Sequence, residues 1–205
     1  MERETLMTKI TIKPKLEMTK NMAQFLGMLR GNGYITKGYQ SIGFANENKD
    51  IVNTFIELGS KIGLHLKIVG NYDNCYRVQS SSKIFTNWYN NLNIYKAFST
   101  PQLNKAFLKG FYLCSGYVYK EKRLNYPYIA INDSNDELIS FVNGLIKDLG
   151  IWTTVNKMKR SKSAFKAGFF NVIHIRRKGE AEKFLKLLGL KKCATSFYFR
   201  QHQSN

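Results

Sequence analysis

The sequence predicts an α+β protein made of two similar halves, and this prediction rests on two repeated stretches and on the elements that come after each of them. Residues 22–34 and 105–118 both carry a small residue at every fourth position, and each small residue of the second stretch lies 83 positions after its counterpart. The small residues are Ala23, Gly27, Gly31, Ala106, Gly110 and Cys114. Because the offset is constant, the chain contains an internal duplication.

Small residues at this spacing lie on one face of a helix and let the backbone of another helix approach closely. Two such helices in one chain are therefore expected to pack on each other. The six small residues form the predicted helix interface.

The first stretch is followed by a hairpin, a helix, a second hairpin and a short helix. Asn46 is expected to cap the longer helix, and Gly63 to end it. The expected elements lie, in order, at residues 22–33, 34–36, 40–45, 51–62, 64–68, 76–79 and 82–91.

The second half repeats this order from Thr100 and Pro101, which read as a helix start. Asp133 or Ser134 is expected to cap its longer helix, whose apolar positions lie 87 after those of the first half. The further elements are expected at residues 117–119, 128–131, 138–149, 151–160, 169–177 and 179–188. The predicted domains are an N-terminal arm at 1–20, repeats at 21–97 and 98–192, and a basic polar tail at 193–205.

The charge of the chain predicts a polyanionic partner. Thirty-two Lys and Arg against 14 Asp and Glu give a formal charge of +18, and 43% of the residues are hydrophobic, so the excess does not indicate disorder. Nucleic acid fits better than a membrane surface, because no amphipathic basic helix, lipidation motif or transmembrane run is present. We expect a monomer.

The three cysteines, Cys75, Cys114 and Cys193, are odd in number and widely spaced. This pattern disfavours a disulfide framework or a zinc site and favours a reducing intracellular compartment, either cytoplasm or nucleoid or an organelle matrix. His65, His174 and His202 likewise lack the spacing of metal ligands.

Two segments, FLGMLRGNG at residues 25–33 and LKGFYLCSG at 108–116, resemble the signatures of the LAGLIDADG homing endonucleases, in particular their single-chain archaeal members. The resemblance spans residues 25–190. It also implies that the protein is intron-encoded. It implies two αββαββα repeats whose signature helices pack at a pseudo-two-fold axis. It also implies two four-stranded antiparallel sheets that form a saddle over the DNA major groove.

The resemblance implies an acid at the penultimate signature position of each half, where the pair holds divalent cations. Here these positions are Asn32 and Ser115. An amide and a hydroxyl supply no negative charge to Mg²⁺, which prefers anionic oxygen ligands. We therefore expect little or no nuclease activity, no catalytic residue and no cofactor, with Mg²⁺ relevant only if some cleavage remains.

The saddle face is predicted by alternation along the strands. Lys157 and Lys159 have inward parity but are included, because alternation can lapse at a strand end beside a basic turn. The predicted nucleic-acid-binding residues are Thr36, Lys37, Ser41, His65, Lys67, Arg77, Gln79, Lys120, Lys122, Thr154, Asn156, Lys157, Lys159, Arg160, His174 and Arg176. Lys120 could instead belong to a catalytic water network.

Three functions are compatible with these observations. The leading one is a double-stranded DNA-binding protein on a degenerate homing-endonuclease scaffold. The second is an RNA-binding maturase or structural RNA-binding protein, because tyrosines on the saddle face could stack on unpaired bases. The third is a residual metal-dependent endonuclease.

Overall fold

The structure, a computed structural model, describes residues 13–36, 40–72, 74–119, 126–159 and 168–190. In the first half the elements are α1 Lys20–Asn32, β1 Gly33–Thr36, β2 Ser41–Asn46, α2 Lys49–Lys61, β3 Lys67–Tyr72, β4 Cys75–Ser81 and α3 Lys83–Asn91. A short 3₁₀ helix, Ile94–Lys96, joins the halves. In the second they are α4 Pro101–Ser115, β5 Gly116–Tyr119, β6 Tyr128–Asp133, α5 Asp136–Asp148, β7 Thr154–Lys159, β8 Phe169–Ile175 and α6 Glu180–Leu187.

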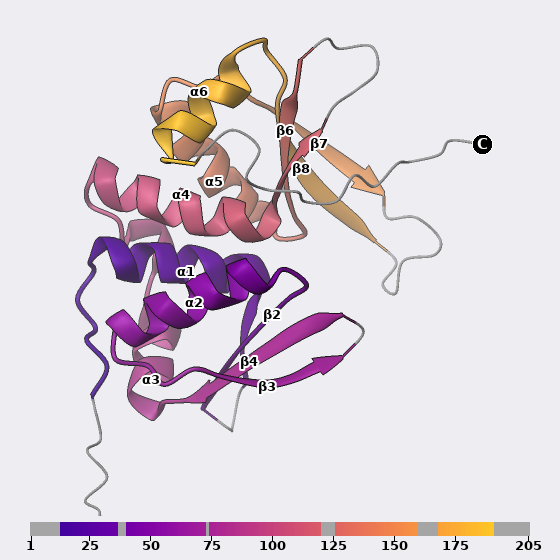
Figure 1. Cartoon of the computed structure of the whole chain (residues 1–205). Helices are drawn as coiled ribbons and strands as arrows, with labels where there is room; N and C mark the ends of the chain where they lie inside the picture. Colours follow the sequence, from indigo (N-terminus) through magenta and orange to yellow (C-terminus); the bar gives the residue numbers. More distant parts are fainter. Residues whose placement is uncertain (1–12, 37–39, 73, 120–125, 160–167, 191–205) are drawn as a thin grey trace, which may run out of the picture.

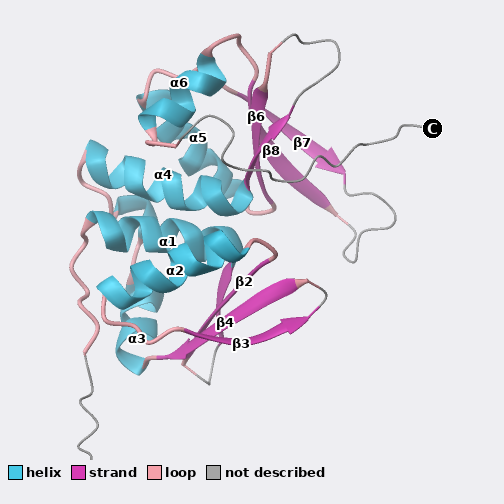
Figure 2. Cartoon of the chain, in the orientation of Figure 1, coloured by secondary structure: helices cyan, strands magenta, loops and turns pink. Residues whose placement is uncertain are grey.

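Both halves build the same sheet. Four antiparallel strands are ordered β1-β2-β4-β3 in one half and β5-β6-β8-β7 in the other. The central helices α1 and α4 lie side by side across the middle of Figure 1, and both sheets lie on their right-hand side. Figure 2 shows the same separation of helices from strands. The predicted α+β architecture of two repeats is confirmed.

The core lies between the helices and one face of each sheet. Phe55 of α2 stacks between Phe25 of α1 and Phe44 of β2, with ring centroids 4.5 and 4.1 Å away. In the second half Phe107 of α4 contacts Phe98 and Phe141, at 4.8 and 5.7 Å. Each helix layer thus covers one face of its sheet, and the opposite face, here called the outer face, is left uncovered by these helices.

The predicted caps of the two longer helices are wrong by one or two residues. Asn48 caps α2, and Asn135 caps α5. The side chains of Asn46 and Asp133 instead accept a hydrogen bond from the backbone N–H of the cap, at 2.8 and 2.7 Å. In each turn two polar residues lie two positions apart and the second one caps the helix, so the first is easily mistaken for the cap.

The strand predicted at residues 64–68 begins later, at Lys67. The N–H of Leu64 is bonded to the carbonyl of Gly59 at 2.8 Å, so this segment completes the end of α2 rather than a sheet ladder. Ile68 is 45% exposed despite its inward parity, because β3 is the edge strand and its pairing shifts between Ile68 and Gly70.

Residues 13–19 precede α1 and lie against the first half without forming a strand. Leu16 and Met18 pack on the core, and the N–H of Lys15 donates to the carbonyl of Ile62 at 2.9 Å. In the part of the chain that is described, none of the helices combines the length and apolarity needed to cross a membrane.

Candidate nucleic-acid interface

The two central helices meet through their glycines. A methyl group on Gly27 would collide with the carbonyl oxygen of Phe107, and one on Gly110 would collide with that of Gln24. The next contacts are also backbone, 2.8 Å from the Phe111 nitrogen and 2.9 Å from the Met28 nitrogen. The contact is reciprocal, so each helix presents the same surface to the other, as the constant offset predicts.

The remaining predicted interface residues lie along the same contact. Ala23 is fully buried, and Ala106 packs partly buried against the core. A Cβ on Gly31 would lie 2.5 Å from that of Cys114, whose thiol has a raised pKa because of burial. The helices therefore stay in contact up to their C-terminal tips.

The tips bring the two predicted signature positions to the same end of the helix pair. Asn32 ends α1, Ser115 ends α4, and the Ser115 Oγ lies 3.1 Å from where a Cβ on Gly31 would be. Within the described residues, no group of three or more His, Cys, Asp or Glu could hold a metal ion. Asn32 and Ser115 offer oxygen atoms without charge, whereas Mg²⁺ sites in proteins use one or two carboxylates.

The strand register defines the outer face of the first sheet. Lys67 pairs with Gln79 and Gln79 with Gly43, while Arg77 pairs with Ala45. Paired residues share a face, so these side chains lie together with Thr36 and Ser41, which also pair. The ring of Tyr34 lies on Gly43, where a methyl group would collide with it, and Tyr34 is 53% exposed.

The outer face of the second sheet has the same register but different side chains. Thr154 pairs with His174, His174 with Ala130, and Ala130 with Tyr117. Asn156 pairs with Val172 and lies on the same face. Next to these, Tyr119 pairs with Tyr128, and the Arg176 guanidinium carbon lies 5.2 Å from the Tyr128 ring centroid.

Two predicted contact residues lie on the outer face but are buried. Ser41 is 3% exposed and His174 is 5% exposed. His174 lies beside Tyr128, with ring centroids 6.2 Å apart. Burial, with a smaller effect of Arg176, lowers its pKa to about 4, so the imidazole is neutral at pH 7. Alternation gives the correct face but not the burial of these two side chains, and their contact with nucleic acid stays a prediction.

The expected lapse of alternation at Lys157 and Lys159 is wrong. Lys157 pairs with Asn171 and Lys159 with Phe169, which keeps both lysines on the helix side. The Lys157 Nζ lies 3.5 Å from a carboxylate oxygen of Asp136. The amide of Asn171 donates to that carboxylate, and this bond, then Lys157, lowers the pKa of Asp136.

The remaining predicted residues divide into two groups. His65 is exposed just before β3, and Arg176 is exposed just after β8. Lys37, Lys120, Lys122 and Arg160 lie outside the described residues.

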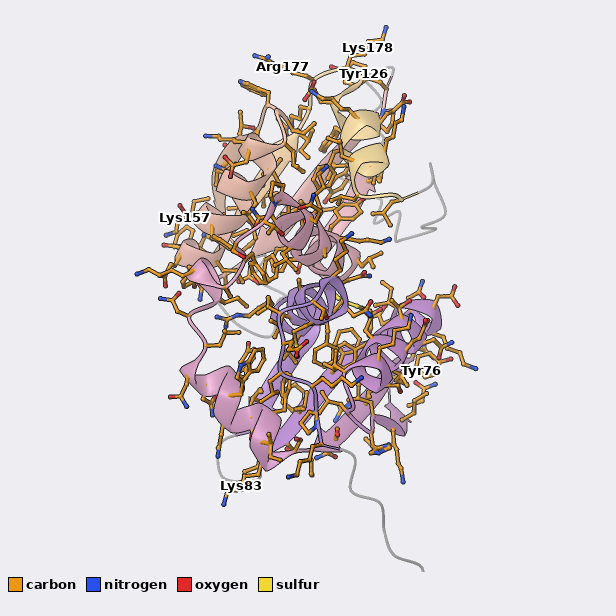
Figure 3. The ribbon with its side chains drawn as sticks, turned by 90° about the vertical axis from the view of Figure 1, so that its left-hand side faces the viewer. Tyr76, Lys83, Tyr126, Lys157, Arg177 and Lys178 are labelled. Atoms are coloured by element: carbon orange, nitrogen blue, oxygen red, sulfur yellow. The ribbon has the colours of Figure 1, made fainter. Side chains whose placement is uncertain are left out.

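Sequence reasoning missed Arg177, whose guanidinium carbon is 4.2 Å from the centroid of the 43% exposed Trp152. The predicted strand at residues 169–177 gives Arg177 inward parity, but β8 ends at Ile175 and Arg177 follows it. In Figure 3, Arg177 and Lys178 lie at one end of the molecule and Lys83 at the other.

The acidic side chains are separated from the outer faces. Among the described strands the only carboxylate is Asp133, at the end of β6, where it faces the start of α5. The other described acids lie in helices or in the segments that lead into them, and they are Glu17, Glu47, Asp50, Glu57, Asp136, Glu137, Asp148, Glu180 and Glu182. The outer faces, as far as they are described, therefore carry cations and neutral groups.

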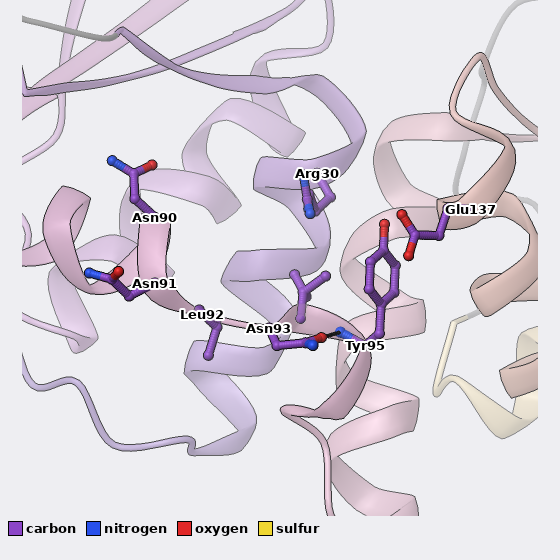
Figure 4. A pocket seen from close by; sticks show the side chains of 8 residues that line it. Arg30, Asn90, Asn91, Leu92, Asn93, Tyr95 and Glu137 are labelled. Atoms are coloured by element: carbon purple, nitrogen blue, oxygen red, sulfur yellow. Dashed lines mark hydrogen bonds between the residues drawn. The ribbon is translucent and has the colours of Figure 1, made fainter.

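A polar pocket marks the joint between the halves (Figure 4). Arg30 of α1, Tyr95 of the joint and Glu137 of α5 line it. Burial, then Glu137, raises the pKa of Tyr95. The Arg30 guanidinium carbon lies 5.7 Å from the Tyr89 ring centroid. The pocket joins elements of both halves through polar contacts and is separate from the outer faces.

Comparison with known proteins shows which sequences this chain is similar to. The LAGLIDADG-like domain family matches residues 102–189. An uncharacterized protein of Methanocaldococcus jannaschii is 29% identical over 179 residues, which cover 81% of this chain and 67% of that protein.

Three solved structures have the same fold. Full-length WhiA from Thermotoga maritima superposes with a TM-score of 0.66 and 15% identity, over 88% of this chain and 58% of WhiA. The N-terminal LAGLIDADG domain of WhiA gives 0.65 and 14%, over 90% and 86%. The homing endonuclease I-DmoI, in complex with DNA and Mn, gives 0.61 and 19%, over 86% and 99%. This chain spans little more than half of full-length WhiA. With its two packed central helices and its two four-stranded sheets, the chain has the LAGLIDADG fold of these structures.

Proposed function

We propose that this chain binds nucleic acid, most favourably double-stranded DNA, on the outer faces of its two sheets and cleaves it little or not at all. The observation that carries this proposal is the separation of charge. Lys67 and Arg77 project from the described outer faces, and carboxylates do not. Because carboxylates repel phosphates, such a face suits a polyanion, and the formal charge of +18 attracts one.

The side chains of these faces supply both kinds of DNA contact. Lys67 and Arg77 can neutralise phosphates, which sets affinity and salt dependence. Gln79, Thr154 and Asn156 can exchange hydrogen bonds with base edges in the major groove, which is wide enough for a two-stranded β-ribbon. I-DmoI was solved with DNA, which supports the same use of the fold here.

The absence of cleavage is proposed from the donor set at the helix tips. Metal-assisted hydrolysis of a phosphodiester needs a cation that activates water and offsets charge on the leaving oxygen. Asn32 and Ser115 have no charge to hold that cation between the strands. The chain would therefore retain a binding surface and lack the means to break what it binds.

A salt titration tests the binding proposal. A duplex selected from a random pool would be measured by fluorescence anisotropy at several salt concentrations. Replacing both Lys67 and Arg77 by Ala should reduce the slope of log K against log salt by about 0.9 per lost phosphate contact. The matched control, Lys49→Ala with Lys147→Ala on helices α2 and α5, should leave the slope unchanged. Equal losses in both variants would contradict the proposed surface.

Cleavage is tested on the same duplex. The wild-type chain with Mg²⁺ or Mn²⁺ should leave the bound duplex intact, whereas cut strands would overturn the proposal of an inactive site. The variant Asn32→Asp with Ser115→Asp should gain Mn²⁺ binding, measured by calorimetry. A gain of cleavage as well would show that only the acids are missing.

We also propose that the protein works as a monomer in a reducing intracellular compartment. Cys75 and Cys114 are free thiols, and one chain supplies both sheets. Sedimentation of the free protein and of its DNA complex tests this, since a dimer in either would contradict it. Loss of binding under reducing conditions would contradict the assignment of the compartment.

A further inference from the structure

Three tyrosines form a connected aromatic surface on the outer face of the second sheet. Tyr119 stacks on Tyr128, with ring centroids 5.1 Å apart and planes inclined by 18°. Tyr117 meets Tyr119 nearly at right angles, with centroids 4.9 Å apart. Tyr117, Tyr119 and Tyr128 are here called the aromatic ladder. Tyr128 is only 9% exposed, so Tyr117 and Tyr119 form its accessible part.

Cationic and neutral groups surround the ladder. Arg176 lies over Tyr128 with its guanidinium carbon 5.2 Å from the ring centroid, and neutral His174 lies beside the same ring. The described outer face around these rings carries no carboxylate. Among the described residues, no carboxylate on this face would repel a negatively charged chain that approaches the rings.

The first half has no such ladder at the corresponding positions. Thr36 and Ser41 pair where Tyr119 and Tyr128 pair in the second half. The exposed ring of Tyr34 lies on Gly43. Because the strand register is the same, the difference lies only in the side chains that each half presents.

We propose that the aromatic ladder binds unpaired bases of a DNA strand, whereas the rest of the outer surface, on both sheets, binds paired duplex. This rests on the function proposed above and names the form of its target. In a duplex, neighbouring bases cover each other's faces, so only unpaired bases can stack on tyrosine rings. Tyrosine is neutral and neutralises no phosphate, and three adjacent rings contribute to affinity mainly when they contact bases. Arg176 supplies the cation that tracks the backbone of the same strand.

The test uses the full chain with three fluorescein-labelled probes: a 30-nucleotide dU strand, the matching rU strand and a 30-base-pair mixed-sequence duplex. Stacking on an aromatic side chain is worth about 1–3 kcal/mol per base, so Tyr119→Leu should weaken binding to the dU strand about 5- to 150-fold. The affinity of the Tyr119→Leu variant for the duplex should change less than about twofold. Tyr119→Phe keeps the ring and should bind like the wild type.

Controls separate stacking from a loss of fold. Tyr76→Leu removes a tyrosine that packs on the helix side of the first sheet and should change neither affinity. Urea unfolding should show that Tyr119→Leu stays folded under the binding conditions.

Three results would overturn the inference. Unchanged affinity of Tyr119→Leu for the dU strand, with duplex binding intact, would do so and leave the proposed function standing. A tenfold preference for rU over dU would assign the ladder to RNA instead. Failure of the wild type to bind any probe would overturn both proposals.

Discussion

The two halves have diverged little at the contact between α1 and α4. They have diverged much more on the outer faces of their sheets. At the helix contact, Gly27 and Gly110 meet equivalent backbone atoms of the opposite helix, so both halves still present the same surface. On the outer faces, the pair Thr36 and Ser41 in one half stands where Tyr119 and Tyr128 stand in the other. Close backbone packing admits only one side-chain size, whereas an outer face can change while the strands keep their register. The duplication is therefore preserved where packing demands it.

The largest effect is expected from a substitution at the contact between α1 and α4, which the two halves share. Gly27→Val would force a branched side chain against the backbone of Phe107 and Phe111, which cannot move aside as a flexible side chain can. We expect a loss of about 3 kcal/mol in the free energy of unfolding, the upper end of what overpacking costs. Urea denaturation measures it.

A second glycine provides the control for this prediction. Gly144 lies within α5, and a methyl group there would meet no atom within 4 Å. Gly144→Ala should stabilise the protein by about 0.5–1 kcal/mol, because alanine restricts the unfolded chain. If Gly27→Val were as harmless as this change, the helix contact would not be the constraint described above.

The helix caps test whether the two halves remain equivalent away from that contact. Asn48 accepts hydrogen bonds from the N–H groups of Asp50 and Ile51, and Asn135 accepts one from Leu138. Asn48→Ala and Asn135→Ala should each cost about 1 kcal/mol. Thermal unfolding of the two variants compares them directly, and a cost at only one site would show that the caps have diverged as the outer faces have.

A pH-dependent effect is expected from His174 in the second half. Burial lowers the pKa of His174 to about 4, below its ordinary value of 6.5. The unfolded chain therefore binds a proton at higher pH than the folded chain does, and stability falls as the pH is lowered from about 6.5 to 4. His174→Gln introduces the residue type found at the equivalent Gln79 and should weaken this dependence, as measured by urea unfolding at pH 7 and 5. An unchanged dependence would mean that other groups cause it.

The smallest effect concerns an exposed carboxylate. The hydrogen bond from Asn171, then Lys157, lowers the pKa of Asp136. Its contribution to stability is present above the unfolded pKa near 4 and is lost as the pH falls through the folded value. Asn171→Ala should raise the pKa of Asp136 toward its ordinary range in an NMR titration, and no change would contradict the assigned cause.

The repeated frame could be predicted from the sequence because periodicity and a constant offset reflect packing that both halves share. Phe44 and Ile42 face the core as alternation requires, and Gly27 and Gly110 meet as their spacing requires. The domain boundaries remain predictions. Asn46 resembles a cap in the sequence because the turn before α2 contains two asparagines.

The details of the candidate interface were harder to predict, because they depend on neighbours that alternation does not include. Ile68 follows inward parity yet stays exposed on an edge strand. His174 follows outward parity yet is buried. Lys157 keeps inward parity because, on the helix side, its ammonium group lies near the Asp136 carboxylate and its backbone pairs with Asn171. Parity gives the face of a strand, but not which side chains cover it.

Lysine reactivity tests most directly whether the outer faces bind nucleic acid. The chain would be treated with a short pulse of an amine-acylating reagent, alone and with the selected duplex, and each lysine quantified by mass spectrometry. We predict that the duplex protects Lys67 on the outer face and leaves Lys49 and Lys147 on helices α2 and α5 as reactive as in the free protein. Protection of Lys49 and Lys147 with Lys67 still reactive would place the nucleic acid on the helix side and contradict the account.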